Sequence, residues 1–151
     1  MLARIALTVV VATGAAVALA STSTAQNIDA IKARKEILKG FGAAAKDPGA
    51  MAKGDAPFDA AKVKAALVAF QAGAPKLPPL FSQDAKTGGE TEALSAIWDN
   101  KTDFEARFVK LASAAKAAEG TMTDEFAFMD AWPKLISENC SSCHKVYRKP
   151  K

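Results

Sequence analysis

The feature that most constrains this chain is the pentapeptide Cys140-Ser-Ser-Cys143-His144, which lies close to its C-terminal end. C-x-x-C-H is the attachment signal of a c-type haem: both thiols add to the haem vinyl groups, and the adjacent imidazole binds the iron. On a helix, residues at i, i+3 and i+4 share one face, so the three side chains can meet one flat porphyrin. We therefore expect one covalent haem c held by Cys140 and Cys143, with His144 as the axial iron ligand.

Three other interpretations of the motif fit less well. A redox C-x-x-C of the thioredoxin type accompanies a βαβ pattern, and the sequence has none. A structural zinc site needs about four ligands, whereas the chain offers two cysteines and one histidine. A disulfide between such close cysteines would be cramped and would leave His144 without a role.

The second axial position of the iron has no obvious ligand in the sequence. Only seven residues follow His144, so a ligand cannot come from downstream. Met51 and Met122 lie in predicted connections, and Met129 lies about 22 Å before His144 on the same predicted helix. Each methionine is better explained as core or surface than as a ligand, and no particular lysine stands out.

Residues 1–25 have the pattern of a secretory signal peptide. Arg4 gives a positive start, residues 5–20 are mainly apolar, and Ser23-Thr24-Ala25 offers small residues for cleavage. The apolar run is short for a membrane anchor, which needs about 20 residues. We predict cleavage after Ala25, with Ala20 as the second option, and export to the periplasm, where bacteria attach c-type haem.

The remaining residues, 26–151, suit a single domain. Loss of the signal peptide removes Arg4 and no acid, so the charge stays slightly positive and two haem propionates would nearly neutralise it. This balance does not favour nucleic-acid binding, and no membrane contact is expected after cleavage. The basic C-terminus is explained by cations that complement a helix dipole.

Apolar residues recur at helical spacing in four segments. The first spans about residues 27–45 and ends at Asp47-Pro48-Gly49, which has turn chemistry. The second begins at Asp59, a good N-cap, and is stopped by Gly73 and Pro75. Its predicted inner residues are Val63, Leu67 and Phe70.

Residues 74–90 are predicted to form an ordered loop whose apolar side chains return to the core. A third helix is predicted over residues 91–119 and a fourth from Thr123, as N-cap, to Arg148. Pro133 should kink or restart the fourth helix because it removes a hydrogen bond. The predicted inner stripe of that helix is Phe126, Met129, Trp132, Ile136, Cys143 and Tyr147.

Four helices with short links and no strand signal predict an all-α fold, an antiparallel four-helix bundle with the covalent haem near the C-terminus. Nearly all of residues 26–151 resembles the class II cytochrome c family, which includes cytochrome c′ and cytochrome c-556. The resemblance is carried by Asp29-Ala-Ile-Lys-Ala-Arg34-Lys-Glu-Ile-Leu38, Gly54-Asp-Ala-Pro57-Phe-Asp-Ala-Ala61, Ala96-Ile97-Trp98 and Cys140-Ser-Ser-Cys143-His144-Lys-Val-Tyr147-Arg148.

The resemblance implies a role for Leu38. Family members with methionine at this position place its sulfur on the iron and are low-spin electron carriers of the c-556 kind. Cytochromes c′ usually have an apolar residue there, and their iron stays five-coordinate and high-spin. Leucine has no lone pair to offer, so Leu38 is expected to cover the distal face of the haem.

Four further residues are carried over from the family. Arg34 matches the arginine that pairs with a haem propionate, the alternative being an ordinary solvent-facing arginine. Arg148 matches the basic residue beside the proximal imidazole, a role compatible with complementing the helix dipole. Glu90 and Thr91 fall where the loop approaches the haem edge.

The function expected from these features is a periplasmic cytochrome c′ that binds nitric oxide or carbon monoxide. The runner-up is a low-spin electron carrier like cytochrome c-556. A peroxidase-like enzyme is the least favoured, because peroxide chemistry needs a distal acid–base group and the one histidine is assigned to the iron. A periplasmic redox partner is expected, and the family often forms homodimers through its first two helices.

Overall fold

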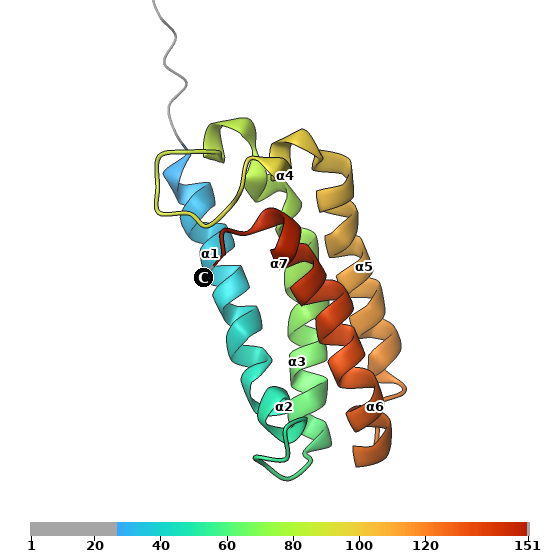
Figure 1. Cartoon of the computed structure of the whole chain (residues 1–151). Helices are drawn as coiled ribbons and strands as arrows, with labels where there is room; N and C mark the ends of the chain where they lie inside the picture. The colour runs from blue at the N-terminus through green and yellow to red at the C-terminus, as the bar shows by residue number, and fades with distance from the viewer. Residues whose placement is uncertain (1–26, 151) are drawn as a thin grey trace, which may run out of the picture.

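Residues 27–150 are described by the computed structural model, and their regular structure is helical apart from one isolated β-bridge between Ala93 and Arg148. Successive long segments run in opposite directions along one axis (Figure 1). The predicted antiparallel four-helix bundle is therefore confirmed. Within the same residues no helix is long and apolar enough to span a membrane. The predicted signal peptide, residues 1–25, lies outside the described part of the chain.

Side chains at the helix starts set where the long helices begin. Asn27 caps α1 (Ile28–Ala44) by accepting a hydrogen bond from Ala30 N at 2.9 Å. Asp59 caps α3 (Ala60–Gly73), as predicted, with bonds from the first-turn amides. At α6 (Glu125–Ile136) the cap is Asp124 and not the predicted Thr123. A carboxylate also complements the positive end of the helix dipole, which favours Asp124.

The predicted turn after the first helix is wrong, because Asp47-Pro48-Gly49 lies inside a short helix, α2 (Lys46–Met51). Pro48 is in the first turn of α2, where its missing N–H would have no partner within the helix. The chain reverses later, at Gly54, whose φ of 79° lies in the left-handed region that suits glycine.

Residues 74–90 form an ordered loop, as predicted. It contains three 3₁₀ turns: η1 (Ala74–Lys76), η2 (Pro78–Phe81) and η3 (Gln83–Ala85). Leu77, Phe81 and Ala85 return to the interior and are at most 4% exposed.

The third long helix begins later than predicted. Residues 91–95 are not helical, and a short helix, α4 (Ala96–Asp99), is separated from α5 (Lys101–Glu119) by Asn100. The backbone of Asn100 (φ −125°, ψ 47°) is not helical. The 91–95 segment instead pairs with the C-terminus, because Leu94 N donates to Tyr147 O at 3.0 Å.

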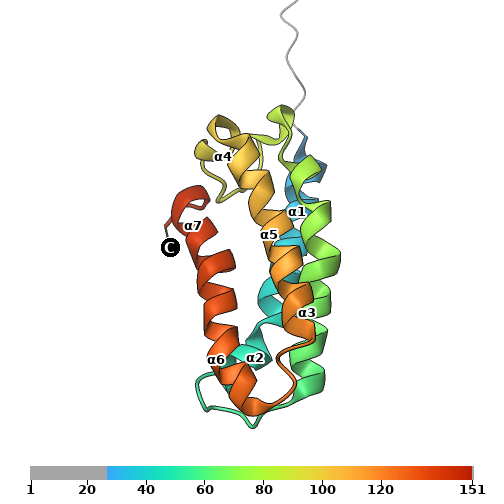
Figure 2. The same cartoon turned by 90° about the vertical axis from the view of Figure 1, so that its right-hand side faces the viewer.

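The last long segment consists of α6, a π-helical turn η4 (Ser137–Ser141) and α7 (Ser142–Tyr147). The predicted restart at Pro133 is wrong, since α6 continues through this residue to Ile136. Pro133 is exposed, so water can replace the hydrogen bond that it removes. The irregularity lies further on, in the π turn. Seen from the side, α6 and α7 run up one edge of the bundle beside α5 (Figure 2).

Aromatic side chains fill much of the core. Phe81 meets Phe104 edge to face at 4.7 Å between ring centroids, and Phe104 meets Tyr147 in the same way at 5.1 Å. The predicted inner stripe of the last segment is partly wrong, because Phe126 is 88% exposed and Met129 is 43% exposed. Trp132 and Tyr147 are buried, as predicted, and the rest of the buried face is made by Phe128, Leu135 and Asn139.

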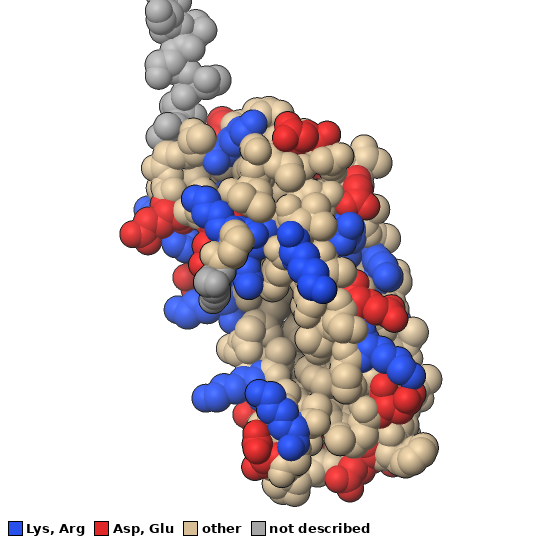
Figure 3. Space-filling view, viewed as in Figure 1, with Lys and Arg blue, Asp and Glu red and all other residues tan. Residues whose placement is uncertain are grey.

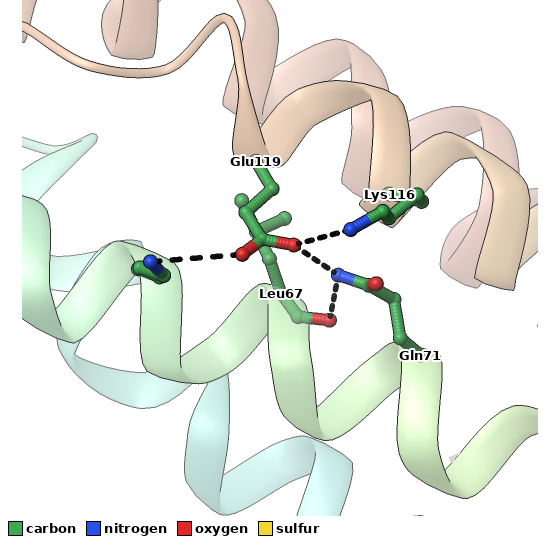
Figure 4. Close-up of polar contacts among 5 residues, drawn as sticks. Leu67, Gln71, Lys116 and Glu119 are labelled. Carbon is green, nitrogen blue, oxygen red and sulfur yellow. Dashed lines mark hydrogen bonds and ion pairs between the residues drawn. The ribbon is translucent and has the colours of Figure 1, made fainter.

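Glu119 joins the end of α5 to α3 (Figure 4). Its carboxylate accepts a hydrogen bond from Gln71 Nε2 at 3.2 Å and forms ion pairs with Lys116 at 3.4 Å and Lys64 at 3.7 Å. The Gln71 hydrogen bond and then the Lys116 charge hold the pKa of Glu119 below its ordinary value.

Candidate functional site

The three residues of the C-x-x-C-H motif lie in one continuous helical segment, as predicted. Cys140 belongs to the π turn η4, whereas Cys143 and His144 belong to α7. The π turn is marked by a hydrogen bond from Ser142 N to Ser137 O, five residues earlier. Such turns are frequently found at functional sites.

Both cysteines are free, half-buried thiols. Burial raises the pKa of each thiol, and Cys143 raises that of Cys140 further. At neutral pH the thiols are therefore protonated, which disfavours their oxidation to a disulfide. Among residues 27–150 no three or more His, Cys, Asp or Glu side chains gather where they could hold a metal ion.

A buried polar atom without a partner lies directly beside Cys140. Asn139 is 8% exposed, and its Nδ2 donates to Leu135 O at 2.9 Å. Its Oδ1 is the one buried side-chain oxygen or nitrogen in the described chain without a hydrogen bond.

Two neutral thiols and an imidazole in one helical segment are the groups that haem c requires, so the residues present fit this cofactor.

A furrow runs along the face of the bundle shown in Figure 3, between α1 and the segment formed by α6 and α7. Leu38 lies on α1 and is 37% exposed although it is apolar. Its predicted position over the distal face of the haem stays a prediction.

Arg34 lies one turn before Leu38 but is buried, with 2% of its surface exposed. Nη1 donates to Leu80 O at 3.1 Å and to Ala85 O at 3.0 Å, and Nη2 donates to Thr91 Oγ1 at 2.9 Å. The guanidinium also lies 4.4 Å from the centre of the Phe81 ring.

This environment excludes the alternative of a solvent-facing arginine. Burial lowers the pKa of Arg34, yet a guanidinium remains charged at neutral pH. The three hydrogen bonds use three of its five N–H groups, so two remain for a carboxylate. Pairing of Arg34 with a haem propionate stays a prediction.

The two candidate haem-edge residues have different surroundings. Thr91 is half-buried, and its hydroxyl accepts hydrogen bonds from Arg34 and from Ala93 N. The Glu90 side chain is 98% exposed and forms an ion pair with Lys35 at 3.7 Å. The hydroxyl of Thr91 is therefore held in place by hydrogen bonds, whereas Glu90 lies at the surface. Contact of either residue with haem stays a prediction.

Arg148 is the C-terminal cap residue of α7, where a cation complements the helix dipole. Its N–H donates to His144 O at 3.2 Å, and its guanidinium lies 3.9 Å from the carboxylate of Glu92. The backbone of Arg148 thus contacts the residue assigned to the iron. A role of its side chain beside the imidazole stays a prediction.

The sequence analysis missed a polar cluster next to the motif. Tyr147 on α7 and Arg107 on α5 both donate hydrogen bonds to Asp103 on α5. The bonds from Tyr147 and then Arg107 hold the pKa of Asp103 below its ordinary value. Spacing hints at this cluster, because Asp103 and Arg107 are four residues apart on a helix and Tyr147 follows His144 by three.

Comparison with known proteins places these features in a family. The sequence profile described as Cytochrome C' matches residues 29–148. The cytochrome c′ of Rhodopseudomonas palustris is 46% identical over 135 residues, which cover 89% of this chain and 92% of that protein. A solved structure of cytochrome c′ from Rhodopseudomonas palustris superposes with a TM-score of 0.78, covering 82% of this chain and 98% of the other.

Two other relatives correspond to the two functions considered for this chain. A cytochrome c-556 from Agrobacterium fabrum is 33% identical over 118 residues, which cover 78% of this chain and 80% of that protein. The solved nitric oxide complex of a cytochrome c prime mutant from Alcaligenes xylosoxidans is 26% identical, with a TM-score of 0.61. It covers 83% of this chain and 98% of the other.

Proposed function

Because the chain belongs to the cytochrome c′ family, whose members carry covalently bound haem c, we propose that it is a five-coordinate, periplasmic cytochrome c′ that binds nitric oxide or carbon monoxide. Cys140 and Cys143 form the thioether bonds, and His144 is the protein ligand of the iron. When bound, the haem supplies an iron whose second axial position accepts a small diatomic gas. Residues 1–25 would direct the export and be removed from the mature protein.

The observation that carries this proposal is Leu38, an apolar side chain on α1 that is 37% exposed. Its side chain has neither a lone pair for the iron nor a proton to donate. A leucine excludes water and bulky ligands by size. Nitric oxide and carbon monoxide need little hydrogen bonding, whereas bound oxygen gains from a donor, which Leu38 lacks. The nitric oxide complex of the Alcaligenes xylosoxidans relative supports the same ligand class.

The methionines of the described chain also support an open axial position. Met51 lies in α2 and Met122 in the connection from α5 to α6, both at the end of the bundle away from α7 (Figure 1). Each is 5% exposed and belongs to the core. Met129 lies on the same helical segment as His144, so it cannot reach the opposite face of one haem.

The alternative function is low-spin electron transfer, and its support is the similarity to the Agrobacterium fabrum cytochrome c-556. In that case a residue other than Leu38 would bind the iron. A haem enzyme of the peroxidase kind is disfavoured, because Leu38 cannot transfer a proton and the buried Arg34 is held by two carbonyls and a hydroxyl.

An optical titration of the purified holoprotein tests this proposal. The ferrous protein should show a broad visible band and a high-spin Soret band, and carbon monoxide should convert it completely to a low-spin spectrum. A sharp pair of α and β bands before any gas is added, with no change under carbon monoxide, would establish the electron-transfer alternative.

A further inference from the structure

Three side chains join α7 to α5 beside the C-x-x-C-H motif, and we call them the Tyr147 clamp. The Tyr147 hydroxyl donates to Asp103 Oδ2 at 2.5 Å, and Arg107 Nε donates to the same oxygen at 2.8 Å. The Arg107 guanidinium also lies 5.2 Å from the centre of the Tyr147 ring. Each of the three side chains therefore contacts the other two.

The clamp is one of two sets of contacts that hold the last turn of α7 in place. The other set consists of backbone hydrogen bonds to the 91–95 segment. Tyr147 O accepts a hydrogen bond from Leu94 N at 3.0 Å, and Lys149 N donates to Glu92 O at 2.7 Å. Tyr147 is 4% exposed and its ring packs against Phe104. Because His144 begins this turn, a shift of the turn moves its imidazole as well.

Apart from the clamp, the Tyr147 ring packs against Phe104 of α5, and Lys110 of α5 lies 4.0 Å from the carboxylate of Glu138 in η4. A surface groove of about 560 Å³ opens between α5 and the π turn η4 directly next to the clamp. Besides Asp103 and Arg107, its lining includes Ala106, Lys110, Asn139 and Ser142. Beside this groove, the Tyr147 clamp supplies a side-chain hydrogen bond that joins α7 to α5.

The two α5 residues of the clamp, Asp103 and Arg107, lie on a helix that is packed firmly into the core. Phe104 and Phe108, on the inner face of the same helix, are buried and meet each other edge to face at 5.0 Å. A carboxylate that receives two charge-assisted or short hydrogen bonds has a defined orientation. The position of Tyr147, and with it the end of α7, is therefore set relative to the core.

We propose that Tyr147, Asp103 and Arg107 are positioning residues that set the orientation of the His144 imidazole toward the haem iron. This inference rests on the assignment of His144 as the iron ligand in the proposed function. In this role the clamp would not bind the iron. It acts through the last turn of α7, as the outer partners of metal ligands generally act through the ligand that they orient.

The test compares wild-type holoprotein with Tyr147→Phe and Asp103→Asn. Tyr147→Phe keeps the buried ring and removes only the hydroxyl, so the protein should still fold. The matched control is Asp130→Asn on α6, which removes an exposed carboxylate from a pair with Lys134 at 2.9 Å. The measurement is the iron–histidine stretching band in the resonance Raman spectrum of the ferrous protein, alongside the thermal unfolding temperature.

We expect the band to shift or broaden in both clamp variants and to stay unchanged in Asp130→Asn. The double variant should shift it no further than the larger single change, because both changes break the same contact. An unchanged band in Tyr147→Phe and Asp103→Asn would overturn the inference even if their unfolding temperatures fell, since a purely structural role lowers stability alone. If the optical spectrum of the wild type shows five-coordinate high-spin ferrous iron and the iron–histidine band is nevertheless absent, the His144 assignment is overturned, and the positioning role with it.

Discussion

Arg34 Nη2 donates a hydrogen bond to Thr91 Oγ1 at 2.9 Å, across 57 residues of sequence. This bond links α1 to the segment that leads into α4. Thr91 O in turn accepts a hydrogen bond from Lys149 Nζ at 3.1 Å, so the segment is also tied to the C-terminus. One buried guanidinium thereby connects the first helix, the 74–90 loop and the end of the chain that carries the haem motif.

Arg34→Ala should destabilise the holoprotein by about 3 kcal/mol, because hydrogen bonds to charged groups are worth about 1.5–3 kcal/mol each and buried acceptors would lose their donor. Denaturant unfolding measures this change. Lys35→Ala, at the next residue on the exposed side of α1, should change stability by less than about 0.5 kcal/mol. If Arg34→Ala and wild type have the same free energy of unfolding, these hydrogen bonds make no net contribution to stability.

The sequence was sufficient for the features that depend on local chemistry. The helical spacing predicted the bundle, and Asp59 was recognised as a cap because a carboxylate before a helix satisfies first-turn amides. The C-x-x-C-H pattern predicted the haem c that the family carries. Burial of the apolar side chains in the 74–90 loop was also predicted correctly.

Features that depend on contacts across the fold were not predictable. Nothing local to Arg34 indicates that its partners are the carbonyls of Leu80 and Ala85. Thr91 to Ser95 has a helix-compatible composition, yet this segment pairs with the C-terminus. Phe126 and Met129 were assigned to the inner face although both are exposed, because alternative apolar stripes overlap on a helix this rich in apolar residues.

Gly73→Ala should destabilise the protein by about 1–3 kcal/mol through overpacking. A Cβ at Gly73 would lie 2.4 Å from Cε1 of Phe41, where α3 approaches α1. Gly40→Ala is the matched control, because no atom lies within 4 Å of a Cβ there. It should instead stabilise the helix by about 0.5–1 kcal/mol. Thermal unfolding of both variants checks the prediction, which fails if Gly73→Ala is as stable as wild type.

Glu119 should make stability depend on pH in the acid range. Its pKa in the folded protein is held below the ordinary value of 4.5, so its contribution is fully present above about pH 4.5 and is lost as pH falls through the folded pKa. Glu119→Gln should therefore be less stable than wild type at neutral pH, and the difference should shrink in acid. Urea unfolding at several pH values measures this, with the exposed Glu36→Gln as a control. A difference that stays constant from pH 7 to pH 3 would contradict the prediction.

Covalent attachment predicts that haem remains with the polypeptide after extraction with acid and acetone, because thioether bonds do not dissociate. The double variant Cys140→Ala with Cys143→Ala should yield apoprotein or haem that is fully extracted. Ser141→Ala, between the two cysteines, is the control and should retain the haem. Absorbance of the protein and solvent fractions measures the outcome, and complete extraction from wild type would end the thioether assignment.

Leu38 decides between the two candidate functions. If its side chain crowds an otherwise open axial position, Leu38→Ala should raise carbon monoxide affinity by about tenfold, since relief of about 1.4 kcal/mol corresponds to that factor. The stability cost should be modest, because Leu38 is already 37% exposed. Equilibrium titration with carbon monoxide measures the change.

Leu38→Met should act in the opposite direction. If position 38 lies over the distal face of the haem, a thioether there would bind the iron, so the variant should become low-spin and bind carbon monoxide more weakly than wild type. Val109→Met is the matched control: it adds a methionine on α5 at a side chain that is 67% exposed, and should leave the spectrum unchanged. If the wild type is already low-spin and neither change at Leu38 alters its spectrum or its carbon monoxide affinity, another residue occupies the axial position. Electron transfer would then be the function that the chain supports.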